Sequence, residues 1–231
     1  MPLLLFDIDG TLLLSDGVGR RTIREALSEI VGRPVTSDSV SFSGRTDPAI
    51  MRDVLLESGC SVDEANELLP ICLETFASIF VERVQPRHMT VLPGVVQLLD
   101  TLAERFRLPL GLVTGNLKTT AFAKLRAAGL EDYFSFGAYG SDHEDRNLLP
   151  GVAMDRARLH GHEPVRAERT VVIGDTEHDI GCSRHAGISV VAVATGKIPL
   201  EQLAEHEPDL LLSDLADHTD LLSFLDGVAS R

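Results

Sequence analysis

The pattern of apolar and polar positions alternates between short, almost continuously apolar runs and longer segments with helical periodicity. The runs that predict strands are Leu3–Ile8, Leu108–Thr114, Thr170–Gly174 and Ile188–Val193, with weaker candidates at Phe134–Tyr139 and Leu210–Leu212. Runs that are apolar at nearly every position are typical of parallel strands covered on both faces. Segments such as Leu117–Ala128 and Asp179–Ala186 predict helices between them, and each is followed by a glycine that commonly ends a helix. This alternation predicts an α/β fold with a parallel sheet.

One long segment interrupts the alternation. From about Gly17 to about Met89 the sequence has helical periodicity and no convincing strand. The expected helices include Ala49–Ser58, preceded by a capping threonine and a first-turn proline, and Val62–Val84, which contains a proline. We therefore expect an all-helical insertion after the first strand of the α/β core.

Composition and charge narrow the class of protein. The chain has 231 residues, of which 44% are hydrophobic and 24% charged, as in ordinary globular proteins. Its net charge of −14 argues against non-specific binding to nucleic acid or to anionic membranes. The three widely spaced cysteines suit a reducing compartment, and the first apolar run is far shorter than the roughly 20 residues of a membrane span. We expect a soluble cytoplasmic protein, either a monomer or a homodimer.

Polar residues follow three of the predicted strands at the point where each strand ends. They are Asp7 and Asp9 after the first strand, Thr114, Gly115 and Asn116 after the second, and Asp175 and Asp179 after the third. In open parallel sheets the ligand site lies beyond the carboxyl ends of the strands, so these groups should converge.

Such a group of residues predicts a site for a metal ion and a phosphate. Asp7, Asp9 and Asp175 offer the hard oxygen ligands that suit Mg²⁺. A carboxylate can also attack phosphorus, and a second carboxyl beside it can serve as general acid and base. The Thr114 hydroxyl and the backbone N–H groups of Gly115 and Asn116, at a helix start, are donors for an anionic phosphate.

Three motifs, DIDGTL, VTGN and GDTEHD, occur in this order at the predicted strand ends. Together they resemble the first, second and fourth motifs of the haloacid dehalogenase superfamily of phosphohydrolases. The resemblance covers essentially the whole chain, because the helical insertion lies where a C1-type cap belongs. It implies a Rossmann-like core at residues 1–15 and 90–231 and a helical cap domain at residues 16–89.

The resemblance also implies roles for individual residues. Asp7 would attack phosphorus, and Asp9 would protonate the leaving oxygen and later activate water. The backbone carbonyl of Asp9 would be a further metal ligand. Thr114 would hold the transferring phosphoryl group, Asp175 would bind Mg²⁺, and Asp179 would support the metal site. An aspartate at position 9 favours phosphoryl chemistry, because dehalogenase members lack an acid there.

The third motif departs from the family pattern. The family places a lysine before a helix start that contains proline, but the corresponding stretch SDHEDRNLLPG contains none. Arg146 is the nearest cation in that stretch and the preferred candidate for the role, and Lys118 is the competitor. Arginine is planar and fork-shaped, so it would hold phosphate differently from lysine. In the insertion, Arg45 is the best candidate for a cap residue that touches substrate.

The sequence therefore predicts a Mg²⁺-dependent phosphatase that acts on a small phosphorylated metabolite through an aspartyl-phosphate. Phosphoglycolate phosphatases are the nearest group by cap type and motif pattern. One alternative is a phosphomutase of the β-phosphoglucomutase type, which shares this core and cap. Another is a non-catalytic binding or regulatory protein on the same scaffold.

Overall fold

The expected strands form one parallel sheet at the centre of the molecule. A computed structural model describes residues 2–105, 107–162 and 164–230 of the chain. In those residues the sheet has the order β5 (Phe136–Tyr139), β4 (Leu110–Thr114), β1 (Leu3–Phe6), β6 (Thr170–Gly174), β7 (Ser189–Val193) and β8 (Leu210–Leu212). Every neighbouring pair is parallel. The predicted α/β fold with a parallel sheet is confirmed.

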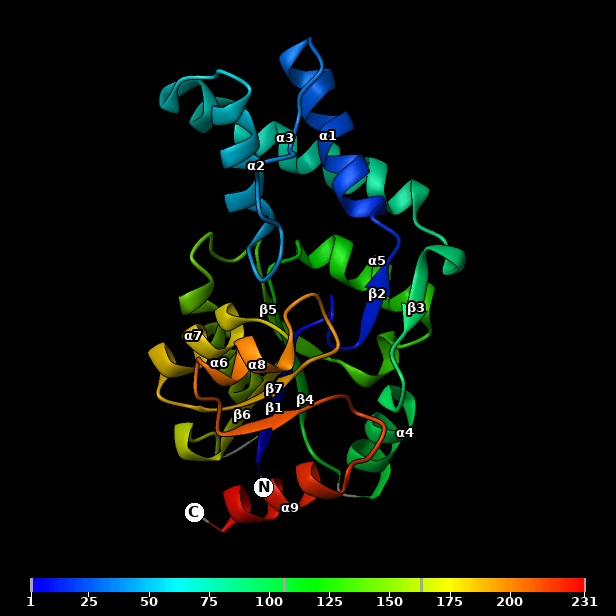
Figure 1. The fold of residues 1–231 in the computed structure, drawn as a ribbon, viewed down its shortest axis with the longest axis vertical. Helices are drawn as coiled ribbons and strands as arrows, with labels where there is room; N and C mark the ends of the chain where they lie inside the picture. Colours follow the sequence, from blue (N-terminus) through cyan, green and yellow to red (C-terminus); the bar gives the residue numbers. More distant parts are fainter. Residues whose placement is uncertain (1, 106, 163, 231) are drawn as a thin grey trace.

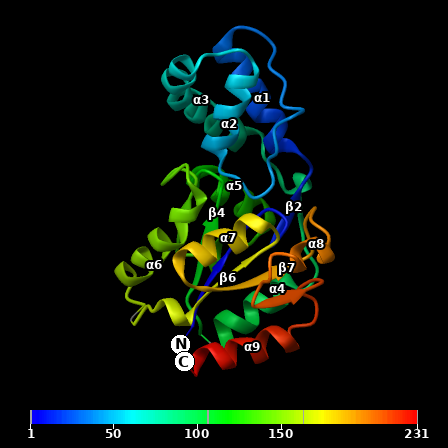
Figure 2. The same ribbon diagram turned by 60° about the vertical axis from the view of Figure 1, so that its left-hand side comes forward.

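Helices cover both faces of the sheet because alternate residues of each buried strand point in opposite directions. Leu4 and Phe6 of β1 belong to one apolar cluster, together with side chains of α4 (Val95–Asp100), α5 (Lys118–Ala128) and α9 (Thr219–Ala229). Leu3 and Leu5 belong to a second cluster with α6 (Leu149–Leu159) and α7 (Glu177–Ala186). Figures 1 and 2 show these helices on the two sides of the central strands.

A helical insertion stands above the carboxyl ends of the strands (Figure 1). It consists of α1 (Val18–Val31), α2 (Asp47–Glu57) and α3 (Val62–Arg83). The chain enters it through β2 (Leu13–Ser15) and leaves it through β3 (Met89–Val91), and these two strands pair antiparallel. The expected all-helical insertion is thus present, although the sequence analysis did not recognise these two short strands.

Side-chain caps explain where two of the insertion helices begin. The Thr46 hydroxyl accepts a hydrogen bond from the Ala49 N–H at the start of α2. Ser61 and Glu64 form a reciprocal capping box at the start of α3, which satisfies two N–H groups of the first turn. Pro70 lies inside α3 without ending it.

Among the described residues, no helix is both long and apolar enough to cross a lipid bilayer.

The remaining elements are short. They are α8 (Leu200–Ala204), the 3₁₀ turns Pro86–His88, Glu131–Tyr133, Arg146–Leu148 and Ala167–Arg169, and a π-helical turn at Thr101–Arg105. Several expected strands are shortened by one or two residues, and β1 ends at Phe6 rather than at Ile8. That shortening leaves Asp7 and Asp9 in the loop beyond the sheet, where their side chains can reach a ligand.

Candidate active site

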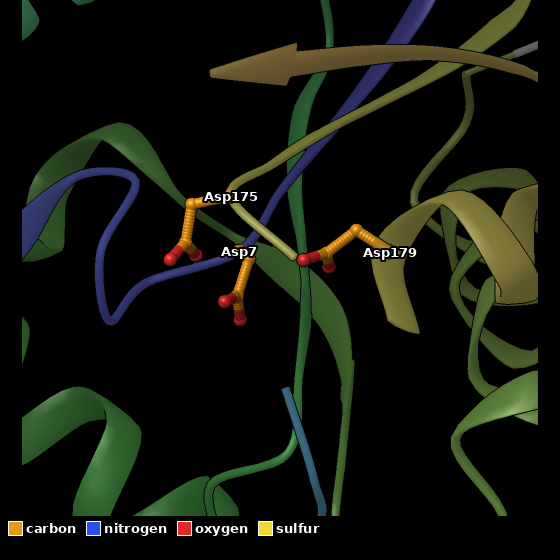
Figure 3. Close-up of side chains that lie close together, drawn as sticks. All are labelled: Asp7, Asp175 and Asp179. Carbon is orange, nitrogen blue, oxygen red and sulfur yellow. The ribbon is translucent and has the colours of Figure 1, made fainter. Parts of the chain in front are cut away.

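Three aspartates meet at the carboxyl ends of β1 and β6. Asp7 follows β1, Asp175 follows β6, and Asp179 lies in the first turn of α7. One carboxylate oxygen from each lies within 4.8 Å of the other two, and all three side chains are buried. Figure 3 shows the three side chains facing a common space. The strand pairing of β1 with β6 is what brings these distant residues together.

Burial and mutual repulsion shift the acidity of this cluster. Burial raises the pKa of Asp7 to about 7, although the positive charge of Arg146 acts to lower it. Loss of solvent and the charge of Asp7 raise the pKa of Asp175 to about 9. Buried carboxylates with raised pKa values are short of compensating positive charge. The cluster therefore fits a divalent cation, which prefers such oxygen ligands.

Arg146 supplies positive charge inside the cluster. Its Nη2 lies 3.3 Å from an oxygen of Asp7 and forms a closer ion pair with Asp179. Burial opposes the charge of this guanidinium, but Asp179 and Asp7 together raise its pKa above the ordinary value. Its Nη1 donates to the backbone carbonyl of Gly44, in the loop before α2, at 2.9 Å.

Lys118, the alternative cation, lies elsewhere. It is exposed at the first position of α5, and its ammonium lies 5.9 Å from the ring centre of Tyr139. Of these two cations, Arg146 is therefore the one that lies beside Asp7.

A second network joins the loop after β4 to Asp9. The Asn116 amide nitrogen donates to the Thr114 hydroxyl oxygen at 2.7 Å and to the Asp9 carboxylate at 2.8 Å. Thr114 is fully buried, whereas the Asp9 side chain is 37% exposed. Because the hydroxyl oxygen accepts from Asn116, its own hydrogen remains available for donation to a ligand.

Lys124, on α5, completes this network and was not identified in the sequence analysis. Its ammonium lies 2.6 Å from Asp9 Oδ2 and 2.6 Å from Asn116 Oδ1. A lysine can only donate, so it fixes the amide with its oxygen toward α5 and its nitrogen toward Thr114. The sequence did offer one signal for it: Lys124 is one of only three lysines in the chain, and it is the one polar residue in the stretch Ala121–Leu125.

The loop before α2, together with the first residue of that helix, closes over this network. The Asp47 N–H donates to the Gly115 carbonyl at 2.7 Å, and the Asp47 carboxylate accepts from the Leu117 N–H at 2.9 Å. A β-carbon at Gly115 would overlap the backbone of Arg45, so the close approach requires glycine. Burial raises the pKa of Asp47 to about 6 in spite of the nearby Lys124 ammonium.

Thr46, just before α2, and Arg52, within α2, also bind the core. The Thr46 hydroxyl donates to the Glu144 carbonyl at 2.7 Å, and Arg52 forms two hydrogen bonds with the Glu144 carboxylate at 2.7 and 2.8 Å. The insertion is therefore closed onto the core in this structure.

A cavity of about 290 Å³ lies between the insertion and the core. Its lining includes Asp7, Asp9, Gly115, Asn116, Lys124, Arg146 and Asp175 from the core, and Arg20, Ile23, Phe42, Arg45 and Phe76 from the insertion. Arg45, the candidate for a cap residue that touches substrate, borders the cavity, and its Nη1 is paired with Asp53 on α2 at 2.7 Å. The cavity is large enough for a small phosphorylated compound next to the aspartates.

Asp9 and Asp179, both expected at the metal site, have partners within the protein. The Asp9 carboxylate is engaged by Lys124 and Asn116 and is not part of the three-aspartate cluster. One Asp179 oxygen pairs with Arg146, and the other accepts from the N–H and hydroxyl of Thr176 in a capping box. Asp7 and Asp175 are therefore the carboxylates best placed to bind an ion directly.

Comparison with known proteins agrees with this geometry. A family model described as haloacid dehalogenase-like hydrolase matches residues 4–193. The chain belongs to this family. It is accordingly an enzyme, a hydrolase of the phosphatase kind, as the motifs predicted.

Individual relatives match most or all of the chain. A phosphoglycolate phosphatase from Rhodobacter capsulatus is 28% identical over 205 residues, which is 87% of this chain and 89% of that protein. The pyrophosphatase PpaX from Anoxybacillus flavithermus is 28% identical over 229 residues, covering 99% and 98% of the two chains. The structure of a β-phosphoglucomutase from Clostridium difficile superposes with a TM-score of 0.74 at 17% identity, with both chains fully covered. This last similarity shows the fold.

Proposed function

We propose that this protein is a Mg²⁺-dependent phosphomonoester hydrolase that works through a phosphorylated Asp7. The observation that carries the proposal is the buried cluster of three aspartates with Arg146, open to a cavity of about 290 Å³. Asp7 and Asp175, supported by Asp179, would hold the ion. Bound Mg²⁺ would neutralise charge on the carboxylates and on the phosphate oxygens, so that an anion can approach.

In the first step an oxygen of Asp7 attacks phosphorus and the ester P–O bond breaks. Asp9 would supply the proton that the leaving oxygen takes up. In the second step Asp9 takes a proton from water, the water oxygen attacks phosphorus, and the bond to Asp7 breaks to release inorganic phosphate. Arg146 and the Thr114 hydroxyl would stabilise the transferring group, because both donate at positions where negative charge develops.

The substrate class that we propose is a small phosphorylated metabolite. The relatives named above act, by their names, on phosphoglycolate and on pyrophosphate. Both are small anions that fit a closed cavity of this size. The phosphomutase alternative is distinguished by its need for a sugar bisphosphate, which simple hydrolysis does not require.

The proposal is tested by phosphate release from a panel of small phosphate esters and pyrophosphate with Mg²⁺. Replacing the nucleophile in Asp7→Asn should lower turnover by at least about 10³-fold, because no covalent intermediate can form. Asp63→Asn, on the surface of α3, serves as the matched control and should retain wild-type turnover. Undiminished phosphate release by Asp7→Asn would refute the assignment, and turnover only with added sugar bisphosphate would favour the mutase.

A further inference from the structure

The cavity is lined by more cations than the catalytic chemistry uses. They are Arg20, Arg45, Lys124, Arg146 and Lys197. Three of them have carboxylate partners within the protein: Arg146 pairs with Asp7 and Asp179, Lys124 with Asp9, and Arg45 with Asp53. Among the described residues, Arg20 and Lys197 form no ion pair, so their charge is free to attract a ligand.

Arg20 is held in a defined position at the start of α1. Its guanidinium carbon lies 3.9 Å from the ring centre of Phe42, and its Nη1 donates to the carbonyl of Ser37 at 2.8 Å. Stacking on an aromatic ring uses one face of the guanidinium, and the bond to Ser37 uses one of its five N–H groups. A fixed guanidinium with unused donors loses little entropy when it binds an anion.

The surroundings of Arg20 do not offer it an internal anion. Ile23, one turn further along α1, and Phe76 of α3 are both 2% exposed and border the same cavity. Charge left beside such apolar side chains is poorly compensated by the protein, and a guanidinium matches the two oxygens of a carboxylate or phosphate in a bidentate arrangement.

We infer that the insertion side of this cavity binds a second anionic group, carried by the leaving group of the substrate, with Arg20 as its main ligand. The inference rests on the proposed function and names its substrate class: a phosphate joined to a short leaving group that bears a carboxylate or a second phosphate. Lys197, an exposed residue in the loop after β7, adds a second positive charge, unpaired among the described residues, at the core side of the same cavity.

The test compares three substrates that share a transferable phosphate. Phosphoglycolate carries a carboxylate, pyrophosphate carries a second phosphate, and ethyl phosphate has a neutral leaving group. Steady-state phosphate release with Mg²⁺ gives kcat/KM for each. Arg20→Gln should lower kcat/KM by about tenfold or more for at least one anionic substrate, mainly through KM, because a charge-assisted bidentate contact is lost. Its kcat/KM for ethyl phosphate should stay within about twofold of the wild type.

Two further variants make the result specific. Arg21→Gln removes the same charge at the next position, where the side chain is exposed and pairs with Asp16, and should leave the ratio between substrates unchanged. Arg20→Lys keeps the charge without the planar fork and should restore part of the preference.

The outcomes separate the two proposals. An equal loss for ethyl phosphate and the anionic substrates in Arg20→Gln would show that Arg20 only holds the loop around Phe42, and the inference would be wrong while the hydrolase proposal stands. If the wild type prefers neither anionic substrate over ethyl phosphate, the inference is likewise wrong and the hydrolase proposal still stands. Absence of phosphate release from all three would overturn both. If only pyrophosphate or only phosphoglycolate responds to the variant, the second group is identified.

Discussion

At the scale of single residues, a row of hydrogen-bond donors determines how the active-site side chains face the cavity. The Lys124 ammonium donates to Asn116, and the Asn116 amide donates in turn to Thr114 and to Asp9. Lys124 thereby fixes the orientation of the Asn116 amide. The amide in turn occupies the Thr114 hydroxyl oxygen as an acceptor, so the hydroxyl hydrogen is left for donation. The orientation of Thr114 therefore depends on a lysine that touches neither the nucleophile nor the three-aspartate cluster.

Removal of the Lys124 ammonium should lower catalysis without unfolding the protein. In Lys124→Met we expect kcat to fall by about 10- to 100-fold, because Asp9 and the Asn116 amide lose the donor that orients them. The effect on KM should be smaller. Lys118→Met, on the exposed face of the same helix, is the control and should behave as wild type. Steady-state kinetics at a fixed Mg²⁺ concentration measures both variants. An unchanged kcat in Lys124→Met would mean that the hydrogen bonds of Lys124 do not contribute to the catalytic step.

Asp47 should make stability depend on pH. Its pKa is raised from 3.8 to about 6 in the folded protein, mainly by burial. Below pH 3.8 both folded and unfolded forms are protonated, and between the two values only the unfolded form ionises. The contribution of Asp47 to stability therefore declines as pH rises through this window, by up to about 3 kcal/mol.

Urea unfolding of the wild type and Asp47→Asn at a series of pH values tests this. Asparagine can still accept from the Leu117 N–H, so the variant should become progressively more stable relative to the wild type between pH 4 and about pH 6. The exposed substitution Asp63→Asn should show no comparable trend. A constant difference between the wild type and Asp47→Asn across this range would contradict the raised pKa.

At the scale of elements, the loop before α2 and the loop after β4 fit together through their backbones. Gly115 lacks a side chain where Arg45 passes over it, and the Asp47 N–H binds the Gly115 carbonyl. Contacts between main-chain atoms leave little freedom for adjustment, so the closed arrangement depends on the size of the residue at position 115.

Gly115→Ala should therefore hinder closure more than folding. The added methyl group would overlap the Arg45 backbone, so we expect kcat/KM for phosphate release to fall by about tenfold or more while the sheet stays intact. Gly151→Ala is the matched control, since a β-carbon there meets nothing within 4 Å, and it should be as active as the wild type. Kinetics together with thermal unfolding measure the two effects. Wild-type kcat/KM in Gly115→Ala would show that closure tolerates the methyl group.

The elements were largely predictable because the signals for them are local. Continuous apolar runs identified the six strands of the sheet, and the glycines after Ala128 and Ala186 identified two helix ends. The strands β2 and β3 were missed because each is only three residues long, and pairing with each other, rather than pattern, makes them strands.

The convergence of residues was predictable where they belong to contiguous motifs. The aspartates were found because DIDGTL and GDTEHD each place them at a strand end. Lys124 and Asp47 were not found, because their partners lie far away in sequence: Lys124 and Asp9 are 115 positions apart, and Asp47 and Leu117 are 70 apart. Only the packing of the insertion on the core determines such pairs, and no short pattern encodes it.

At the scale of the whole molecule, net charge and local charge have opposite effects on an anionic ligand. The chain has a net charge of −14, yet the cavity lining holds five cationic side chains beside four aspartates, two of which belong to the three-aspartate cluster. The metal-free cluster reduces its own repulsion by retaining protons, which is the meaning of the raised pKa values of Asp7 and Asp175.

Binding of Mg²⁺ should therefore release protons. At pH 7.5 the Asp175 carboxyl, with a pKa of about 9, is mostly protonated, and Asp7, with a pKa of about 7, is partly so. We expect about one proton released per ion, and affinity that increases between pH 6.5 and pH 9. Titration calorimetry in two buffers of different ionisation enthalpy measures this number. Heat that is identical in both buffers would contradict the prediction, and Asp175→Asn should bind Mg²⁺ weakly with little proton release.

The ribbon formed by β2 and β3 limits how the insertion can travel. Both passages of the chain between the two parts run through this one pair of strands, which is extended by bonds between Leu12 and Leu92 and between Asp16 and His88. Two unpaired connections would allow the insertion to rotate and to shift sideways relative to the core. A hydrogen-bonded two-stranded ribbon bends easily in one direction only. The insertion should therefore open and close by a hinge motion about the β2–β3 ribbon. A disulfide engineered between β2 and β3 should leave this hinge motion free. A disulfide engineered between the loop before α2 and the loop after β4 should hold the insertion in the closed position.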